Sequence, residues 1–143
     1  MNPETVFLDT NIFLRYLTND VPEQADAVER VLQLAAENQV ILVTNGLVIA
    51  EIVWTLQSFY RLTRASIAEK VRAILNTPGI EVSEGDLVLQ AVADYVEKNV
   101  DFIDAYHGAW LLAQGMKAVL TFDQLHFSRL DGITVKLPKQ AMA

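Results

Sequence analysis

Short apolar runs alternate along this chain with longer segments whose apolar residues recur at helical spacing. Five short runs rich in Val, Ile and Leu predict buried strands, at 5–8, 40–43, 80–82, 118–121 and 133–135. Apolar residues at helical period predict helices between them, at 20–37, 46–60, 63–75, 87–96 and 103–114. Strands that alternate with helices are typical of parallel βαβ units, so we expect a three-layer α/β/α sandwich with a central, mainly parallel sheet.

Polar residues at the ends of the helical segments support these boundaries. Asp20 and Glu23 have the spacing of a capping box at the start of the first long helix. Thr44 or Asn45 can cap the helix that follows the second strand, and Gly115 stands where a helix C-cap is expected. The helix ends are therefore predicted by capping chemistry as well as by periodicity.

The composition limits the kind of protein this can be. The chain has 143 residues, of which 52% are hydrophobic, so it can bury one core and we expect residues 1–143 to form a single domain. It has no cysteine, which excludes disulfides, thiolate nucleophiles and Cys-based metal sites. No apolar run approaches the roughly 18 residues of a membrane span, and no basic segment precedes an apolar one at the N-terminus. We therefore expect a cytoplasmic protein with no membrane partner.

The charge of the chain is acidic. Eighteen Asp and Glu residues against eleven Lys and Arg residues give a formal net charge of −7. This balance opposes a partner held mainly by counterion release from phosphates. It does not exclude nucleic acid, because carboxylates gathered around divalent cations are neutralised locally.

Four carboxylates fall near the ends of the predicted strands, where ligands bind in open parallel sheets. Asp9 and Asp123 follow strands, Asp104 opens a helix, and Glu51 lies two turns into the helix after the second strand. The helix neighbours of Glu51 are apolar, and an unpaired carboxylate buried among them would be costly, so we expect it to need a cation. An all-oxygen ligand set favours Mg²⁺ or Mn²⁺ and is suited to cleavage of a phosphodiester.

These residues give the sequence a resemblance to the PIN-domain ribonucleases of the VapC toxin type, over nearly the whole chain. The resemblance rests on residues 7–11, on Glu51, on residues 101–105 and on residues 120–123 ahead of Phe127. It implies a metal-dependent endoribonuclease that cleaves single-stranded or structured RNA, with Mg²⁺ or Mn²⁺ as cofactor. It also implies a cognate antitoxin protein as partner, and a homodimer.

The resemblance assigns the catalytic and metal-binding roles to the four acids named above, Asp9, Glu51, Asp104 and Asp123. Several of these positions also have a structural interpretation. Asp9 can cap a helix, Asp104 can stabilise a helix dipole, and Asp123 can be a turn residue. Three further polar residues are expected to support the site: Asn11, Asp101 and Thr121. Asn11 can equally be a turn residue, Asp101 an N-cap, and Thr121 a hydrogen-bonded hydroxyl at a strand end.

Basic residues and a histidine are further candidates. Arg15, Arg61 and Arg64 are candidate RNA contacts, although a surface position or pairing with an acid explains each as well. His107 lies one helical turn beyond Asp104 and is either a general base or, more commonly for a lone helix histidine, a rim or core residue.

The segment 46–60 is more apolar than one buried face requires. It ends with Phe59 and Tyr60, which we expect to contact a second protomer or an antitoxin.

Two other functional classes remain open at this stage. A phosphoaspartyl phosphatase or receiver-like protein also has an Asp after its first strand, but the phosphatase needs a second acid two residues later, where Asn11 stands. A non-catalytic interaction module could use the same acids to hold a structural cation. Metal-dependent cleavage of RNA would separate the nuclease from both.

Overall fold

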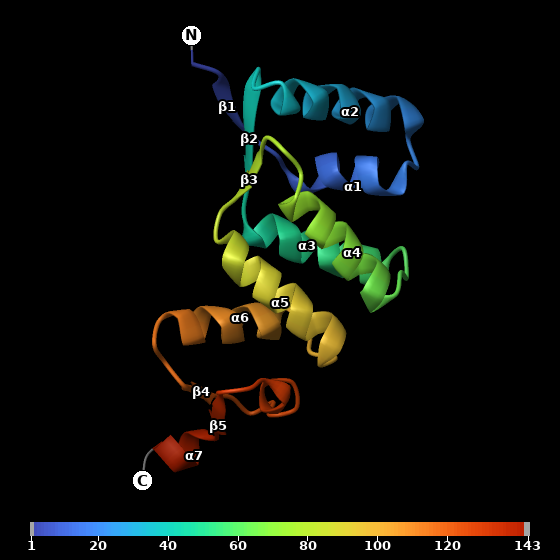
Figure 1. The fold of residues 1–143 in the computed structure, drawn as a ribbon. Coiled ribbons are helices and arrows are strands. Elements are labelled where there is room, and N and C mark those ends of the chain that lie inside the picture. The colour runs from blue at the N-terminus through green and yellow to red at the C-terminus, as the bar shows by residue number, and fades with distance from the viewer. Residues whose placement is uncertain (1, 142–143) are drawn as a thin grey trace. The chain divides into compact units, whose positions relative to one another are not determined.

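The computed structural model describes residues 2–141 of the chain. The chain divides into two compact units, an N-terminal unit, Met1–Gly85, and a C-terminal unit, Asp86–Ala143. Each unit contains a parallel sheet of its own (Figure 1). Asp9 and Glu51 belong to the N-terminal unit, and Asp104 and Asp123 belong to the C-terminal unit.

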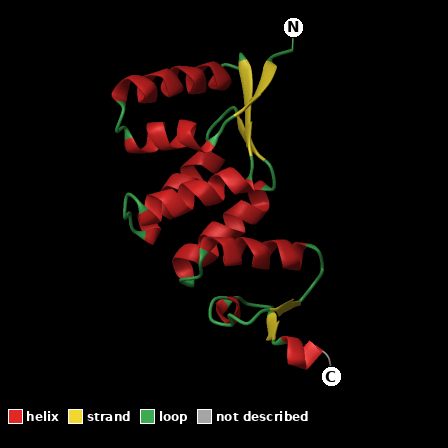
Figure 2. Ribbon diagram, turned by 180° about the vertical axis from the view of Figure 1, so that it is seen from behind, coloured by secondary structure: helices red, strands yellow, loops and turns green. Residues whose placement is uncertain are grey.

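The N-terminal unit alternates strands and helices as the apolar pattern predicts. The prediction that its first strand is buried is wrong, because this strand lies exposed at the edge of the sheet. Its elements are β1 Glu4–Phe7, α1 Thr10–Thr18, α2 Pro22–Ala36, β2 Val40–Thr44, α3 Gly46–Ser58, α4 Arg64–Leu75 and β3 Ile80–Val82. The three strands are parallel and follow the order β1-β2-β3, so β2 is central (Figure 2). Helices α1 and α2 form an antiparallel pair joined by a short turn (Figure 1).

The register of β1 and β2 places two chain segments at one edge of this sheet. Glu4 lies opposite Val40 and Phe7 lies opposite Val43. Just beyond the paired residues, the Leu8 N–H donates to the Val43 carbonyl oxygen at 2.8 Å. Because the strands are parallel, Asp9 and the beginning of α3 leave the sheet at the same carboxyl edge.

Capping side chains explain where most of these helices begin. The Asn45 side chain accepts a hydrogen bond from the Val48 N–H at 3.1 Å, and Thr63 accepts one from the Ser66 N–H at 3.1 Å. The capping box predicted at Asp20 is wrong, because α2 begins at Pro22 with Val21 as an N-cap that makes no side-chain bond. Proline favours the first helical position, and this preference determines the start of α2.

The core of the N-terminal unit comes from β2, α3 and α4. Each of the following side chains is at most 1% exposed: Leu42, Ile49, Ile52, Leu56, Ile67 and Val71. The turn before β3 packs closely on the end of α2. Gly79 has φ +85° there, and a Cβ at this position would lie 2.6 Å from the backbone of Ala35.

The C-terminal unit contains two long helices, a two-stranded parallel sheet and two short helices. Its elements are α5 Gly85–Glu97, which starts at the unit boundary, α6 Phe102–Ala113, β4 Ala118–Leu120, the 3₁₀ helix η1 Phe127–Arg129, β5 Thr134–Lys136 and α7 Pro138–Ala141. The short helices η1 and α7 were not predicted from the sequence. Buried side chains include Tyr95 and Phe102, whose rings meet edge to face with centroids 6.3 Å apart. Gly108 lets α6 approach Leu130 closely, since a Cβ at this position would lie 2.5 Å from Leu130 Cδ1.

Candidate active site

Asp9 lies at the junction of β1 and α1. It is the N-cap residue of α1, and its Oδ1 accepts a hydrogen bond from the Thr10 N–H at 2.7 Å. The side chain is exposed. The structure therefore confirms the cap interpretation of Asp9, and this bond occupies only one of its two carboxylate oxygens.

Two polar residues follow Asp9 on the first turn of α1. Asn11 is exposed, whereas Thr10 is 8% exposed. Within residues 2–141, the Thr10 hydroxyl is buried with no hydrogen-bond partner. A buried polar atom in this condition is unusual and deserves an explanation, such as a ligand or water bound beside Asp9. Thr10 was not predicted as a site residue, because a hydroxyl between two polar residues gives no sign of burial in the sequence.

Glu51 lies on the exposed face of α3. The buried side chains of this helix are Val48, Ile49, Ile52, Val53 and Leu56. Glu51 shares the opposite face with Leu47 and Trp54, which are 75% and 69% exposed. The expectation that Glu51 is buried among apolar neighbours is therefore wrong. Of its apolar neighbours on the helix, Val48 and Ile52 point to the buried side, whereas Leu47 and Trp54 are themselves exposed.

In the C-terminal unit, Asp104 lies in the first turn of α6, and Asp101 is the N-cap residue of that helix. Burial raises the pKa of Asp104 above its ordinary value, and the negative charge of Asp101 raises that pKa further. Asp123 also raises it, while His126 and His107 act in the opposite direction. Two predicted site acids, Asp104 and Asp123, thus interact electrostatically although 19 positions separate them.

Asp123 is held in a tight turn after β4. Its N–H donates to Thr121 Oγ1 at 3.1 Å, and the Thr121 hydroxyl donates back to the Asp123 carbonyl at 3.2 Å. Asp123 Oδ1 accepts the Leu125 N–H at 3.2 Å. Thr121 therefore shapes the turn that presents Asp123, and the turn interpretation of Asp123 is confirmed.

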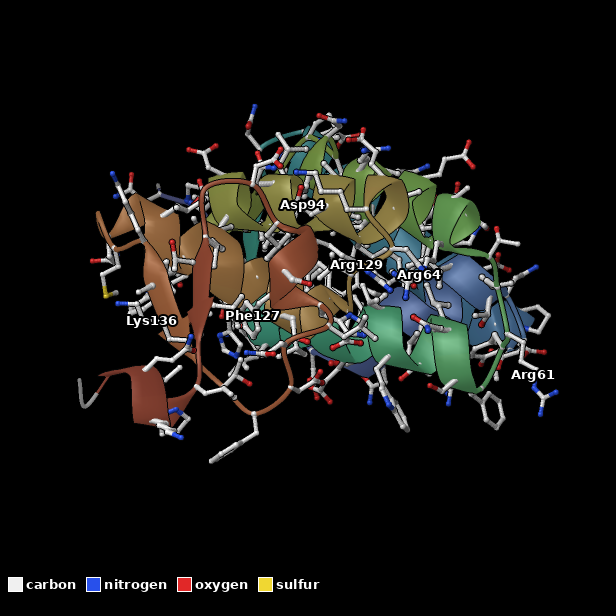
Figure 3. The ribbon with its side chains drawn as sticks, turned by 90° about the horizontal axis from the view of Figure 1, so that it is seen from below. Arg61, Arg64, Asp94, Phe127, Arg129 and Lys136 are labelled. Carbon is white, nitrogen blue, oxygen red and sulfur yellow. The ribbon has the colours of Figure 1, made fainter. Side chains whose placement is uncertain are left out.

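The basic candidates differ in their surroundings. Arg15 Nε donates to the Gln24 side chain at 2.8 Å, and its Nη1 lies 3.7 Å from Asp20 Oδ1, which matches the interpretation of Arg15 as paired with an acid. Arg64 is half-buried. Arg61 is exposed and extends away from the ribbon (Figure 3). Of the three, Arg61 is the most accessible to a large ligand.

A second histidine, His126, makes a contact that was not predicted from the sequence. His126 Nδ1 accepts a hydrogen bond from the Asp101 N–H at 2.7 Å. His107, the histidine singled out from the sequence, is exposed and meets the Tyr106 ring with centroids 6.5 Å apart. Only the fold brings residue 126 to the start of α6, so no local pattern could have indicated this contact.

The chemistry of the four acids suits a hard divalent cation, because all their donor atoms are carboxylate oxygens. Over residues 2–141, no group of three or more His, Asp or Glu side chains is arranged to hold a metal ion. The electrostatic interaction of Asp104 with Asp101 and Asp123 nevertheless makes positive charge favourable beside α6. The donor set of the chain therefore fits Mg²⁺ or Mn²⁺.

The chain is an α/β protein with parallel strands, and acidic residues follow two of these strands. Residues 6–133 match the PIN domain, and the chain belongs to the PIN-domain family. The chain is also 27% identical over 128 residues to a VapC ribonuclease of Aquifex aeolicus (strain VF5), which covers 90% of this chain and 93% of the relative. The predicted family and α/β fold class are thus confirmed.

Within residues 2–141, no helix combines the length and the apolar character needed to cross a membrane.

Proposed function

We propose that this protein is a Mg²⁺- or Mn²⁺-dependent endoribonuclease, the toxin of a toxin–antitoxin pair, acting on single-stranded or structured RNA. The observation that carries the proposal is the PIN-domain match over residues 6–133, which includes all four acids. Two of them, Asp104 and Asp123, also interact electrostatically. The similarity to a VapC ribonuclease over most of both chains supports the choice of RNA and of a toxin.

In this proposal, the catalytic and metal-binding residues are Asp9, Glu51, Asp104 and Asp123. The four acids hold the cation, and residues 1–143 work as one PIN-like nuclease domain. The family match supports this, since it spans both units. Asn11, Asp101 and Thr121 support the acids, and Arg15, Arg61 and Arg64 are the proposed RNA contacts.

The residues of the chain prepare the acids for this task. The Thr10 N–H fixes one oxygen of Asp9, and the Leu125 N–H fixes one oxygen of Asp123. Carboxylates that are oriented before a ligand binds lose less conformational entropy on binding. The chemistry that a bound divalent cation supplies is activation of water and stabilisation of the charge that develops on the phosphate. Water then adds to phosphorus, the P–O bond to the leaving nucleotide breaks, and the leaving oxygen takes up a proton.

The proposals about location and partners rest on the same similarity to a VapC ribonuclease. We propose that the protein acts in the cytoplasm, that a cognate antitoxin inhibits it, and that it forms a homodimer. The exposed Phe59 ring, at 75%, is the surface feature that supports a protein partner.

The proposal is tested with end-labelled single-stranded RNA and purified protein, in Mg²⁺, in Mn²⁺ and in EDTA. Cleavage is expected only with metal, and Asp9→Asn, Glu51→Gln and Asp104→Asn are expected to abolish it. Asp123→Asn is expected to reduce cleavage less, because its turn geometry is retained through Thr121.

Matched controls are available on α2, where Asp26 and Glu29 are exposed. Asp26→Asn and Glu29→Gln make the same chemical changes and are expected to cleave at the parent rate. An Asp9→Asn protein that cleaves like the parent would refute the assignment of Asp9. Metal binding by the parent without any cleavage would show the non-catalytic module instead.

A further inference from the structure

The beginning of α6 uses an unusual partner for its N-cap residue. Asp101 is the N-cap, and its side chain makes no capping hydrogen bond. Its backbone N–H donates to His126 Nδ1 at 2.7 Å. His126 belongs to the loop that follows Asp123 and leads into η1. A residue from a distant loop thus satisfies the first backbone donor of the helix.

In many helices this donor is satisfied from within the helix. The acidic side chain at the third helical position, N3, reaches back to the N–H of the N-cap residue, as in a capping box. In α6 the N3 residue is Asp104. Because His126 accepts the Asp101 N–H, this donor is not used to hold the Asp104 carboxylate. His126 therefore leaves Asp104 available to a ligand.

The same contact anchors the loop that carries Asp123. Two further contacts join this loop to the turn between α5 and α6: Arg129 donates to the Asn99 carbonyl, and Lys98 Nζ lies 2.9 Å from Asp131 Oδ2. Arg129 lies in η1 (Figure 3), and the N-cap residue of this helix is His126. His126 is the member of this set nearest in sequence to Asp123 and the one that bonds to the helix carrying Asp104.

We propose that His126 is a positioning residue of the nuclease site, which keeps Asp104 from capping α6 and fixes the Asp123 loop against the start of that helix. The part of this inference that concerns the nuclease site rests on the proposed function. His126 acts through Asp101, Asp104 and the loop, and it has no chemical step of its own. Its Nδ1 must be free of a proton to accept the Asp101 N–H.

Two substitutions separate positioning from a general structural role. In His126→Asn the carbonyl oxygen Oδ1 stands at the same number of bonds from the backbone as Nδ1, so it can accept the Asp101 N–H. In His126→Gln the carbonyl is one bond farther away, at the place of Nε2. The pair differs by one methylene and has the same functional group, so that the two variants serve as mutual controls.

Three measurements are made on the parent and on both variants. Amide hydrogen exchange of Asp101 reports the contact itself, Mn²⁺ affinity without RNA reports the acids, and kcat with KM reports cleavage. For His126→Gln we expect Asp101 exchange and the Kd for Mn²⁺ to rise about 10-fold, as for loss of an outer-sphere partner, and kcat to fall while KM for RNA stays constant. His126→Asn is expected to restore the parent values.

Each other result is decisive. Parent-like Asp101 exchange in both variants overturns the contact, and faster exchange with unchanged Mn²⁺ affinity and kcat reduces His126 to a structural cap. A parent that binds Mn²⁺ but does not cleave RNA refutes the proposed function, while the exchange and affinity values still decide the role of His126. A parent that binds no Mn²⁺ overturns both.

Discussion

The two buried threonines of the N-terminal unit differ in what their hydroxyl groups contact. Thr44 is 2% exposed and donates to the Leu8 carbonyl at 3.1 Å, which ties the end of β1 to β2. Thr10 is 8% exposed, and within the described residues its hydroxyl has no partner. A buried hydroxyl with a partner stabilises a fold, whereas one without a partner destabilises it.

Replacing each threonine by valine is therefore expected to have opposite effects on stability. Thr44→Val should lower the free energy of unfolding by about 1 kcal/mol, because it removes a buried hydrogen bond. Thr10→Val should leave it unchanged or raise it by up to about 1 kcal/mol. Urea denaturation in EDTA measures both, with equal m-values as the condition for comparison. An equal loss in the two variants would mean that Thr10 has a partner in the folded protein.

Asp104 gives a prediction about pH, because its pKa is raised by burial and then by Asp101. A raised pKa means that the folded protein binds this proton more tightly than the unfolded chain, so ionised Asp104 opposes folding. Asp104→Asn is therefore expected to melt at a higher temperature than the parent in EDTA at pH 7. The difference should decline as pH falls through the raised pKa and vanish below 3.8, the ordinary value.

Added Mg²⁺ is expected to reverse this ranking. The parent gains stability by mass action when it binds the cation, and the variant, with one ligand fewer, gains less. Thermal melts over a Mg²⁺ series, with Asp26→Asn as the control, measure the effect. If Asp104→Asn melts lower than the parent in EDTA and both respond equally to Mg²⁺, then Asp104 is a structural cap.

At the scale of elements, glycines with positive φ serve two different purposes. Gly79 combines φ +85° with close packing on the end of α2, where an added Cβ would lie 2.6 Å from the backbone carbon and oxygen of Ala35. Gly115 has φ +81° after α6, and a Cβ there would meet nothing within 4 Å. The first glycine is required by conformation and by space, and the second by conformation alone.

Substitution by alanine should separate these two requirements. Gly115→Ala is expected to cost about 1 kcal/mol, the conformational penalty of a left-handed residue. Gly79→Ala should cost more than about 2 kcal/mol, since the backbone of α2 or of the turn must also move. Chemical denaturation of the two variants measures the difference. Equal losses of unfolding free energy in the two variants would show that the end of α2 moves to accommodate the added methyl group at little cost.

The sequence predicted elements well where local chemistry determines them. Asn45 is one of the two caps expected for α3, and Thr63, one of two residues at which α4 could begin, caps that helix. Prediction failed where a distant partner decides. Asp20 does not cap α2, because it accepts hydrogen bonds from Thr18 at 3.0 Å and from the Tyr60 hydroxyl at 2.7 Å, and the second partner is 40 residues away.

The same distinction applies to the candidate site. The positions of Asp9 and Asp104 at the starts of helices follow from their neighbours in sequence. The exposure of Glu51 depends on which face of α3 is buried, and the long-range contact of His126 depends on the path of a loop. Tertiary packing determines both. The apolar pattern of α3 does not show which face is buried, because this helix is apolar on most sides.

At the scale of the whole molecule, the aromatic end of α3 concerns assembly. Phe59 is 75% exposed, and its ring meets the Tyr60 ring edge to face at 5.0 Å. The Tyr60 hydroxyl binds Asp20, so Tyr60 is fixed within the unit while Phe59 is presented to solvent. A rigidly supported exposed ring is typical of a protein interface.

Phe59→Ser is therefore expected to weaken self-association without a loss of fold. Its free energy of unfolding should stay within about 0.5 kcal/mol of the parent value, as for other surface substitutions. Leu89→Ser, at a side chain of α5 that is 50% exposed, is the control. Sedimentation velocity at micromolar concentrations measures the oligomeric state. A monomeric parent, or equal association of parent and Phe59→Ser, would contradict the prediction.

The division of the four acids between two units also has a consequence during synthesis. Asp9 and Glu51 lie in the unit that leaves the ribosome first, and Asp104 and Asp123 lie in the one that follows. The roughly 50 residues between Glu51 and Asp104 take about 3 to 10 s to translate. Under the proposed function, a growing chain, or one ended early by a premature stop codon, holds only half of the acids. Under the same proposal, the growing chain cannot attack RNA near the ribosome that is making it until the codons for Asp104 and Asp123 have been read.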